Sequence, residues 1–471
     1  MRDARILAWR LHPQTRLRRT RDGGAAFLPE TATTVELDTE AFAALAALAT
    51  PQTACELRCR LIGQFCRNFT VAEVDILLRD LAAPGFIMES HDEMAGHPIP
   101  PPALCDPPSF APAPESVHLQ LNNVCNLRCP SCYVGLQEED WGSLPLERIF
   151  ALIDEWAKMG VFQLALGGGE PLISPKFVPT VCRARQHGIV PNVTTNGWAL
   201  TEGLLDEIVS CIGEVRLSLN DAVSVNTRVL EEKAALARAR GVRFGFNLII
   251  TRRNLDCLAD LLGWACAQGA ATINLIRPKP APGNAPWYAQ NALAPADSHL
   301  LLGLLGELEP ICIGTTLTVD CAFSFLFYGR SAEELKARGV AGCAMGDRFA
   351  TVRWNGDVYP CSHLRGEEFK AGSVRTESFR DIWERSAVFT DVRRELGQVE
   401  GHCGGCSHNA FCKGCRAVMR QATGNWLAAD HECGVNSGQA GFAASRLNMS
   451  VSLPVPMKKS VRLSFHTLTD I

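Results

Sequence analysis

The sequence lacks the features that would place the protein in a membrane or on a nucleic acid. It contains no uninterrupted run of about 18 apolar residues, the length that a membrane-spanning helix needs. Positive and negative charges nearly balance, with a formal net charge of −4, so the composition gives no reason to expect a nucleic-acid or membrane partner. The first residues carry scattered arginines without a following apolar segment or cleavage-like site. We therefore expect a cytoplasmic protein.

Cysteine, in contrast, is abundant, with 20 among the 471 residues. A chain of this length predicts two or three domains rather than one small core. Because cytosolic thiols stay reduced, so many cysteines indicate metal or redox chemistry rather than disulfides. Two groups of closely spaced cysteines stand out in the sequence: Cys125, Cys129 and Cys132, and then Cys403, Cys406, Cys412 and Cys415.

The region before the first cysteine group has the pattern of a small separate domain. Residues 98–114 contain eight prolines, which favour an extended linker and exclude a helix or a central strand. Ahead of this linker, TACE (53–56) and TVAE (70–73) both fit a capping box. With the apolar run around Phe42, they predict three short helices, which lie between an initial strand and a strand-like GFIM (85–88). On the second of these helices, Cys55 and Cys59 are expected to be small buried apolar residues.

From residue 116 to about 300 the pattern alternates between strand and helix. Helical stretches such as 146–159 and 254–268 separate the apolar segments. Six successive strand and helix units favour an α/β fold with a parallel sheet, built as a partial TIM-like barrel with its chemistry on the loops after the strands. The expected strands are SVHLQLN, FQLAL, VPNVTT, EVRLSL, RFGFNLII and TINLIR.

The three-cysteine motif CNLRCPSC follows the first of these strands directly. A cubane iron–sulfur cluster has four irons that each need an external ligand, so three thiolates leave one iron open to a small molecule. Zinc is the alternative for a close group of cysteines, although zinc sites usually show a fourth protein ligand. The spacing resembles that of the radical S-adenosylmethionine (SAM) superfamily. The resemblance implies that Cys125, Cys129 and Cys132 hold a [4Fe-4S] cluster whose open iron is chelated by SAM, the source of a 5'-deoxyadenosyl radical.

Three further loops extend this resemblance. LGGGEPL (166–172) follows the second strand and is similar to the superfamily's GGE motif, which implies that Gly168, Gly169 and Glu170 hold the methionine amine of SAM. Polar residues at later strand ends, namely Ser218, Asn220 and Asn247, stand where the family contacts the ribose and the carboxylate, although such residues also serve as helix caps. The family's aromatic residue before the third cysteine is replaced by Ser131, so adenine stacking must come from elsewhere, with Tyr133 as a candidate.

The second cysteine group resembles the SPASM extension of radical SAM enzymes, which holds auxiliary iron–sulfur clusters. A zinc ribbon is the alternative, because CxxC pairs bind either metal. The family's ligation implies an outer cluster on Cys403, Cys406, Cys412 and Cys433 and an inner cluster on Cys343, Cys361 and Cys415. This arrangement supplies one thiolate too few for two complete [4Fe-4S] clusters. Either the inner cluster has an open iron, or Cys321 completes it; we favour Cys321.

The order of elements in the first region resembles the winged-helix-like PqqD domain, which binds leader peptides; a cap that packs on the next domain is the alternative. With this domain, the chain resembles maturation proteins of the quinohemoprotein amine dehydrogenase type. This resemblance implies that the protein forms thioether crosslinks within a ribosomally made peptide, each joining a cysteine sulfur to a carbon of Asp, Glu or another residue. The expected partners are a peptide or small protein substrate with a leader and an electron donor such as flavodoxin or ferredoxin. The expected boundaries are 1–95 for the PqqD-like domain, 96–115 for the linker, 116–310 for the barrel, 311–440 for SPASM and 441–471 for a tail in which SVRLSF is compatible with an edge strand.

Two other functions stay open at the level of sequence. CKGCRA (412–417) also resembles relatives that modify haem side chains, which generally lack a leader-binding domain. A non-catalytic iron–sulfur electron carrier is a second alternative, and it would not cleave SAM. Six remaining cysteines, in the linker or on apolar faces, are expected to be filler: Cys105, Cys182, Cys211, Cys257, Cys266 and Cys312.

Overall fold

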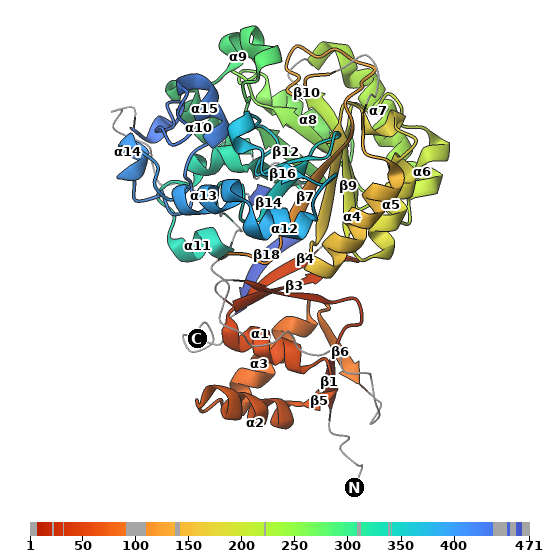
Figure 1. Cartoon of the computed structure of the whole chain (residues 1–471), viewed down its shortest axis with the longest axis vertical. Coiled ribbons are helices and arrows are strands. Elements are labelled where there is room, and N and C mark those ends of the chain that lie inside the picture. Colours follow the sequence, from red (N-terminus) through yellow and green to blue (C-terminus); the bar gives the residue numbers. More distant parts are fainter. Residues whose placement is uncertain are drawn as a thin grey trace. The chain divides into compact units, whose positions relative to one another are not determined.

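The computed structural model describes two compact units, Met1–Pro112 with Met457–Ile471, and Ala113–Pro456 (Figure 1). Most of the expected linker, including Cys105, and most of the expected tail lie outside the described residues. None of the helices in the described part of the chain is both long and apolar enough to cross a bilayer. The described residues are 7–20, 23–31, 33–90, 110–136, 142–220, 223–308, 312–337, 340, 342–436, 450–452 and 458–463.

The first unit contains two small sheets within its described residues. Their strand orders are β5-β1-β6 and β18-β4-β3-β2. The sequence predicted a single strand ahead of the helices, which is wrong, since four precede them. Strands such as GGAAFL and RLRRT have little β-branched character, so antiparallel pairing with neighbours rather than local propensity forms them. The strands are β1 (Ala8–Leu11), β2 (Arg16–Thr20), β3 (Gly23–Leu28), β4 (Thr33–Leu37), β5 (Gln52–Thr53), β6 (Ile87–Ser90) and β18 (Lys458–Leu463).

Three helices follow, as predicted: α1 (Thr39–Ala47), α2 (Ala54–Phe65) and α3 (Val71–Ala82). Both capping boxes are present. In the second, the Glu73 amide donates to Thr70 Oγ1 over 3.2 Å and the Thr70 amide donates to Glu73 Oε2 over 2.6 Å. These reciprocal bonds satisfy amide groups that the first turn of a helix leaves without partners, which fixes where α3 begins.

The prediction that Cys55 and Cys59 are buried is wrong. Both thiols are exposed, and so is that of Cys66. Leu57 and Leu61, four residues apart, form the buried face of α2. Cys55 and Cys59 lie two residues away from them, which is half a turn around the helix and therefore on its solvent side.

The second unit is built on one large, mostly parallel sheet. Across the described residues it has 11 strands in the order β16-β15-β14-β7-β8-β9-β10-β11-β12-β13-β17. The six predicted strands are β7 to β12 and run in sequence order, which confirms the α/β fold with a parallel sheet. The strands are β7 (Ser116–Asn122), β8 (Gln163–Gly168), β9 (Val190–Thr195), β10 (Glu214–Asn220), β11 (Phe244–Ile249), β12 (Thr272–Ile276), β13 (Thr316–Asp320), β14 (Phe349–Val352), β15 (Asp357–Tyr359), β16 (Gly372–Ser373) and β17 (Ser450–Ser452).

Helices connect the strands and cover the sheet (Figure 1). The predicted helix at 146–159 is α4, which buries a stripe including Leu152 and Trp156 and ends at Gly160 in the left-handed conformation (φ 90°). The helix predicted at 254–268 begins only at Leu258, because the Asn254 side chain accepts from the Thr251 amide in a preceding turn.

The α-helices of this unit are α4 (Leu146–Met159), α5 (Phe177–Gln186), α6 (Glu202–Ile208), α7 (Val223–Ala239), α8 (Leu258–Ala267), α9 (Ala285–Asn291), α10 (Pro295–Leu308), α11 (Ala332–Ala337), α12 (Phe379–Arg385), α13 (Ala387–Glu395), α14 (Gly401–Gly404) and α15 (Arg416–Thr423). Its 3-10 helices are η1 (Pro171–Ile173), η2 (Pro282–Asn284), η4 (Cys321–Phe327), η5 (Glu367–Phe369) and η6 (Gly434–Asn436). Since β7 to β13 are parallel, their carboxyl ends share one edge of the sheet, where loops from distant parts of the sequence meet.

Candidate active site and cluster sites

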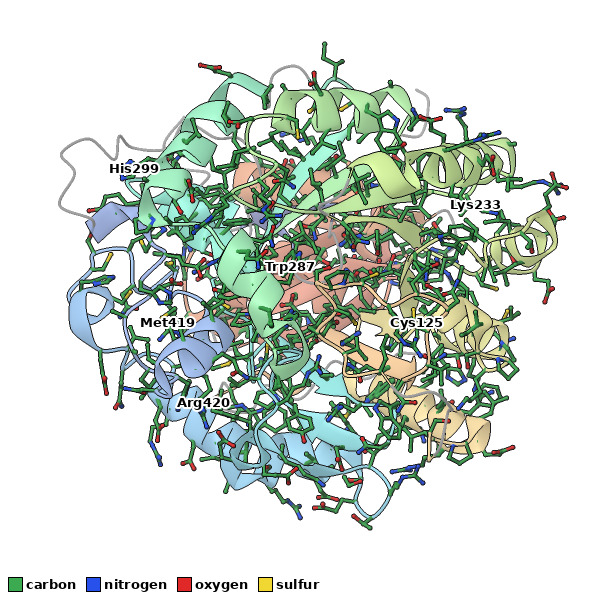
Figure 2. The ribbon with its side chains drawn as sticks, turned by 90° about the horizontal axis from the view of Figure 1, so that it is seen from above. Cys125, Lys233, Trp287, His299, Met419 and Arg420 are labelled. Atoms are coloured by element: carbon green, nitrogen blue, oxygen red, sulfur yellow. The ribbon has the colours of Figure 1, made fainter. Side chains whose placement is uncertain are left out.

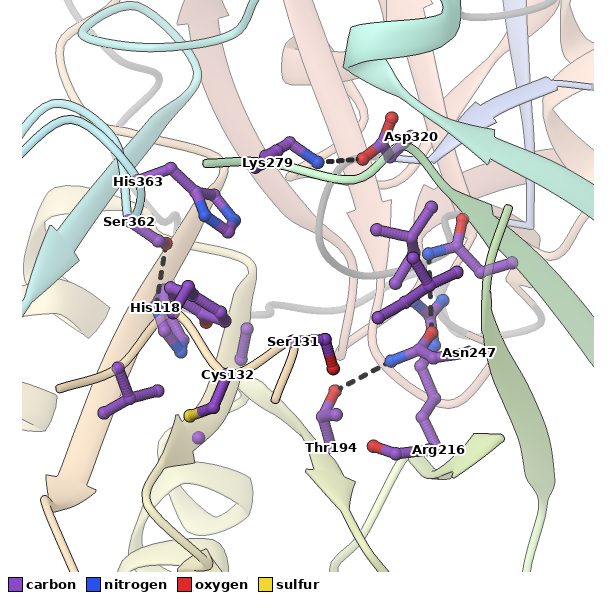
Figure 3. A pocket seen from close by; sticks show the side chains of 18 of the residues that line it. His118, Ser131, Cys132, Thr194, Arg216, Asn247, Lys279, Asp320, Ser362 and His363 are labelled. Carbon is purple, nitrogen blue, oxygen red and sulfur yellow. Dashed lines mark hydrogen bonds and ion pairs between the residues drawn. The ribbon is translucent and has the colours of Figure 1, made fainter. Parts of the chain in front are cut away.

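A cavity of about 350 Å³ lies at this edge of the sheet. Figure 3 shows side chains from several strands and from the loop after β15 pointing into it. Seen from above in Figure 2, Cys125 and Met419 of α15 lie on opposite sides of Trp287, which also lines the cavity. The structure brings together here most of the residues that the sequence singled out: Cys125, Cys129, Cys132, Gly168, Gly169, Glu170, Ser218, Asn220, Asn247, Cys321, Cys343, Cys361 and Cys415.

The loop that carries the first three cysteines begins where β7 ends. Hydrogen bonds within the loop fix its path: the Cys132 amide donates to the Cys129 carbonyl over 3.0 Å, and Arg128 donates to the Cys125 carbonyl over 2.7 Å. The Cys125 sulfur accepts from the Leu127 amide over 3.4 Å. Burial raises the pKa of the Cys125 thiol, and the Leu127 amide opposes that rise. Amide donors of this kind stabilise a thiolate, the form in which cysteine binds metal.

The glycine loop packs directly on the start of the cysteine loop. A Cβ at Gly168, where φ is +125°, would lie 2.3 Å from the Asn122 carbonyl oxygen, and one at Gly169 would lie 1.9 Å from that of Val124. Glycine is therefore required by the close approach of the two loops. The Asn122 side chain holds this approach, because it donates to the Glu170 carbonyl and accepts from the Gly169 amide. Sequence reasoning missed Asn122, a buried polar residue at the end of an apolar strand.

The Glu170 carboxylate joins the ends of β8 and β9. Its Oε1 accepts from Thr195 Oγ1 over 2.7 Å and its Oε2 accepts from the Asn196 amide over 2.9 Å. Burial raises the pKa of Glu170, whereas these donors lower it. Both oxygens of the Glu170 carboxylate thus already accept hydrogen bonds from the protein. Asn196, which the sequence did not single out, also donates to the Cys125 sulfur over 3.7 Å and so ties this network to the cysteine loop.

Ser218 and Asn247 stand opposite each other in the register of β10 and β11. Asn247 donates to Thr194 Oγ1 over 3.2 Å (Figure 3), and Asn274 donates to Asn247 Oδ1 over 3.4 Å. Asn220 has a positive φ of 54° at a register irregularity that ends the pairing of β10. The inner face of the sheet therefore carries a row of polar groups beside the cysteine loop, as a polar nucleotide cofactor would need.

Tyr133 is placed differently from an adenine platform. Its ring packs against His363, with ring centroids 4.1 Å apart, and the Arg365 guanidinium lies 4.8 Å from its ring centre. Both partners follow Cys361 in the sequence. The ring thus connects the first cysteine loop to the segment of an auxiliary ligand, and adenine stacking by Tyr133 stays a prediction.

Four further thiols line the same cavity, those of Cys321, Cys343, Cys361 and Cys415. Cys321 opens η4, and Cys415 immediately precedes α15. Three of them share one apolar cluster with Met345. The pKa of the Cys321 thiol is raised by burial and, next in size, by the negative charge of the Cys343 thiolate, as expected for neighbouring sulfurs. The geometry therefore permits the eighth ligand to be Cys321.

The four cysteines expected to hold the outer cluster line a second cavity: Cys403, Cys406, Cys412 and Cys433. Backbone amides donate to three of these sulfurs, each over 3.4 Å: His408 to Cys406, Gly414 to Cys412 and Asp430 to Cys403. Amide donors to sulfur are a feature by which proteins tune iron–sulfur clusters. The structure thus sorts the SPASM cysteines into the inner and outer groups that the sequence resemblance implied.

A buried ion pair holds the segment between the two groups. Arg277, which follows β12, donates to both carboxylate oxygens of Asp430 and to Glu432. Burial opposes the ionisation of Asp430, but the Arg277 guanidinium prevails and lowers its pKa to about 2. Asp430 also accepts from the Cys415 amide over 2.9 Å. A few charged residues therefore fix an inner ligand relative to the segment that carries Cys433.

Nearby, Lys279 forms an ion pair with Asp320, the residue before Cys321 (Figure 3). Burial lowers the pKa of Lys279, but the nearby negative groups, the Asp320 carboxylate first and then the thiolates of Cys415 and Cys321, together raise it above its ordinary value. Asp320 also caps η4 by accepting from the Ala322 amide over 3.1 Å. This pair holds the start of η4, and hence Cys321, against the cavity wall.

Comparison with known proteins identifies the domains of the second unit. Residues 119–253 match the Radical SAM superfamily, and residues 343–416 match SPASM, an iron-sulfur cluster-binding domain. The chain thus contains a radical SAM domain, which binds SAM and a [4Fe-4S] cluster, and a C-terminal SPASM domain, which binds auxiliary clusters. Within the described ranges, no three His, Cys, Asp or Glu side chains form a group that could hold a single metal ion, and the thiols line the two cavities.

The chain is homologous to several curated enzymes. It is 29% identical over 377 residues to the mycofactocin maturase MftC of Mycobacterium tuberculosis, covering 74% of this chain and 93% of the relative. It is 28% identical over 377 residues to the PqqA peptide cyclase of Xanthomonas campestris pv. campestris, covering 74% and 94%. It is also 27% identical over 347 residues to the AdoMet-dependent heme synthase of Methanosarcina barkeri, covering 68% and 96%.

A solved structure shares the fold over nearly the whole chain. Streptococcus suis SuiB, bound to its precursor peptide SuiA, superposes with a TM-score of 0.67 over 90% of this chain and 99% of that one, at 14% identity. The match confirms the predicted α/β fold.

Proposed function

We propose that this protein is a radical SAM maturase that forms intrapeptide thioether crosslinks in a ribosomally made peptide or small protein. The observation that carries the proposal is the single cavity between the first cysteine loop and the inner auxiliary thiols, lined by both Cys132 and Cys361. A substrate held there would lie within reach of a radical source on one wall and an electron acceptor on the other. Homology to a PqqA peptide cyclase and structural likeness to a peptide-bound SuiB support a peptide substrate.

The proposed chemistry needs both the first cysteine loop and the inner auxiliary thiols. When bound and reduced, the first cluster with SAM supplies a 5'-deoxyadenosyl radical, which removes a hydrogen atom from an unactivated carbon. The substrate thiol would lose its proton as the carbon–sulfur bond forms, and the one electron released would need an acceptor, which a cluster held by the inner auxiliary thiols would supply. The substrate thus loses a pair of hydrogen atoms for each crosslink. The protein's part is to position the substrate carbon and to exclude water.

We assign the ligands as the sequence predicted them. Cys125, Cys129 and Cys132 would hold the first cluster, and the backbone of Gly168 and Gly169 would face the methionine amine. Glu170 would act mainly by fixing this loop, since its carboxylate already accepts from Thr195 and Asn196. The polar residues Ser218, Asn220 and Asn247 would contact the ribose and carboxylate. Two auxiliary [4Fe-4S] clusters would use the inner set, Cys321, Cys343, Cys361 and Cys415, and the outer set, Cys403, Cys406, Cys412 and Cys433.

The first unit is proposed to bind the leader of the substrate. Three antiparallel strands followed by three helices, β2-β3-β4 and α1-α2-α3, are compatible with the PqqD-like domain expected at 1–95. This arrangement supports the resemblance to maturation proteins of the quinohemoprotein amine dehydrogenase type, and with it the three-part plan with the barrel at 116–310 and SPASM at 311–440. An electron donor such as flavodoxin or ferredoxin would reduce the first cluster.

A small-molecule substrate is the second candidate, supported by homology to an AdoMet-dependent heme synthase. That relative matches 68% of this chain and 96% of its own length, so part of this chain has no counterpart in it, as is also true of the peptide maturases. The peptide function accounts for an additional unit, whereas the haem function does not require one.

Mass spectrometry of a peptide substrate separates the two candidates. The full chain, reconstituted with iron and sulfide without oxygen, is incubated with SAM, a reductant and a cysteine-containing peptide encoded beside its gene. Loss of a pair of hydrogen atoms per crosslink, absent with the Cys125→Ala variant, supports the proposal. Cleavage of SAM with every such peptide unmodified contradicts it and favours the small-molecule function.

A further inference from the structure

The four-stranded sheet of the first unit is completed by a strand from the far end of the sequence. Strands β2, β3 and β4 are consecutive and antiparallel. On the outer edge of β4 lies β18, which follows the second unit in the sequence and runs parallel to β4. In the register, Lys458, Val461, Arg462 and Leu463 stand opposite Thr33, Val35, Glu36 and Leu37.

Two features make the pairing of β18 with β4 weaker than the pairing of the other strands in this sheet. It is parallel, a geometry slightly less stable per residue than antiparallel pairing. Its register shifts between Lys458 and Val461, so three residues of β18 span two of β4. By comparison, β3 and β4 pair over five consecutive positions without irregularity. Of the strands in this sheet, β18 is therefore the one most readily released.

Strand β4, on which β18 pairs, is held in place by contacts that do not involve β18. Thr34, Val35 and Leu37 of β4 are buried, and β4 is also held by its full pairing with β3. If β18 left, β4 would keep its position and present a row of unpaired amide and carbonyl groups. Such an edge is a template for another extended chain.

We propose that β18 is a built-in competitor at the edge of β4: it occupies this edge until an extended leader segment of the peptide substrate displaces it. This inference rests on the proposed peptide function and adds a built-in competitor to it. The register also names the preferred segment. An incoming parallel strand would place apolar residues opposite Val35 and Leu37 and a basic residue opposite Glu36, the apolar, basic, apolar order of residues 461–463.

Because β18 competes for the edge of β4, a leader must exceed a minimum affinity to bind there. Because β18 belongs to the same chain, it competes for β4 as an intramolecular segment, at an effective concentration on the order of millimolar. A leader binds only the fraction of molecules in which the edge is open, so its apparent affinity falls by that fraction. Only a segment that pairs better than β18, for example without a register shift, would bind at low concentration.

Removal of β18 tests the proposal directly. We compare the full chain with a variant that ends at Pro456, using as probe a fluorescent synthetic peptide of residues 457–466. The expected result is binding to the shortened variant and at least about tenfold weaker binding to the full chain. A peptide of the same composition in scrambled order is the control. Equal binding to both proteins, or binding of neither peptide to the shortened variant, overturns the proposal.

Hydrogen exchange reports on the edge itself. Amides of residues 33–37 should exchange faster in the shortened variant and regain protection when the probe peptide is added. A charge exchange adds an internal control: Glu36→Arg should speed exchange at this edge in the full chain, and Glu36→Arg combined with Arg462→Glu should restore protection. If the single and double variants exchange alike, β18 does not pair as proposed.

The two proposals fail in different ways. Deletion of residues 457–471 should leave cluster content and SAM cleavage unchanged, since these residues lie outside the second unit. It should raise kcat/KM for a modified peptide. Probe binding without any peptide modification would overturn the proposed function. Peptide modification that the deletion leaves unchanged would overturn the role of β18.

Discussion

Arg277 and Asp430 form a two-pronged ion pair in the interior of the second unit, with both N···O distances at 2.7 Å. They lie 153 residues apart in the sequence. The pair joins the end of β12 to the segment before Cys433, and Asp430 passes the connection on to the Cys415 amide. The auxiliary ligands are thus held in place by charged residues that are not themselves ligands.

Replacement of Arg277 by alanine should cost the protein its auxiliary clusters first. Removing one partner of a buried ion pair leaves an uncompensated charge and costs about 3 to 5 kcal/mol. We expect iron and sulfide content to fall after reconstitution while SAM still binds. Arg380→Ala is the matched control, because Arg380 pairs with Glu384 on the surface, where such pairs contribute little. Equal iron content in R277A and R380A would contradict the structural role of the pair.

The glycine loop gives a second prediction. Gly169→Ala would place a methyl group 1.9 Å from the Val124 carbonyl oxygen and force the cysteine loop away from β8. We expect loss of the first cluster and of SAM binding, measured by iron content and equilibrium dialysis. Gly203→Ala is the control, since a Cβ there meets nothing within 4 Å. A Gly169→Ala protein that still binds SAM normally would show that the two loops can separate.

Cys321 decides the state of the inner auxiliary cluster. If it is the eighth ligand, Cys321→Ser should change the electron paramagnetic resonance spectrum of the reduced inner cluster or lower its iron content. Cys257→Ser, at the N-terminal end of α8, is the control and should change neither. An unaltered spectrum in the Cys321→Ser variant would mean that the inner cluster keeps an open iron.

The capping box of α3 predicts a pH dependence. The Thr70 amide lowers the pKa of Glu73 in the folded protein. Because the folded pKa is below the unfolded value of about 4.3, this stabilisation is present above that value and is lost as the pH falls through the folded pKa. Amides of α3 should therefore exchange faster as the pH falls below about 4, relative to the intrinsic rate. In Glu73→Gln, whose side chain does not titrate but can still accept from the Thr70 amide, this dependence should be absent; an unchanged dependence would place its origin elsewhere.

The sequence predicted those parts of the molecule that depend on local pattern. The alternation of apolar strands and amphipathic helices gave β7 to β12 and α4, and the spacing of Thr70 and Glu73 gave the start of α3. The cysteines and the GGE motif placed the cavity lining, because residues after parallel strands meet at one edge of a sheet.

Contacts between residues far apart in the sequence could not be predicted from local sequence pattern. Asn122, Asn196 and Arg277 contact partners that lie 48, 71 and 153 residues away, and nothing next to them in the sequence signals those partners. The side of α2 on which Cys55 lies could have been found from Leu57 and Leu61, which show the period of the buried face. The short N-terminal strands depend on pairing rather than on residue preference, so they were missed.

Reductive cleavage of SAM is the most direct test of the central claim, that a three-thiolate cluster leaves one iron open to this cofactor. The anaerobically reconstituted full chain, with SAM and dithionite, should release 5'-deoxyadenosine and methionine, and the variant with Cys125, Cys129 and Cys132 replaced by alanine should release none. Release of no 5'-deoxyadenosine by a protein whose iron and sulfide content matches three full clusters would contradict the account.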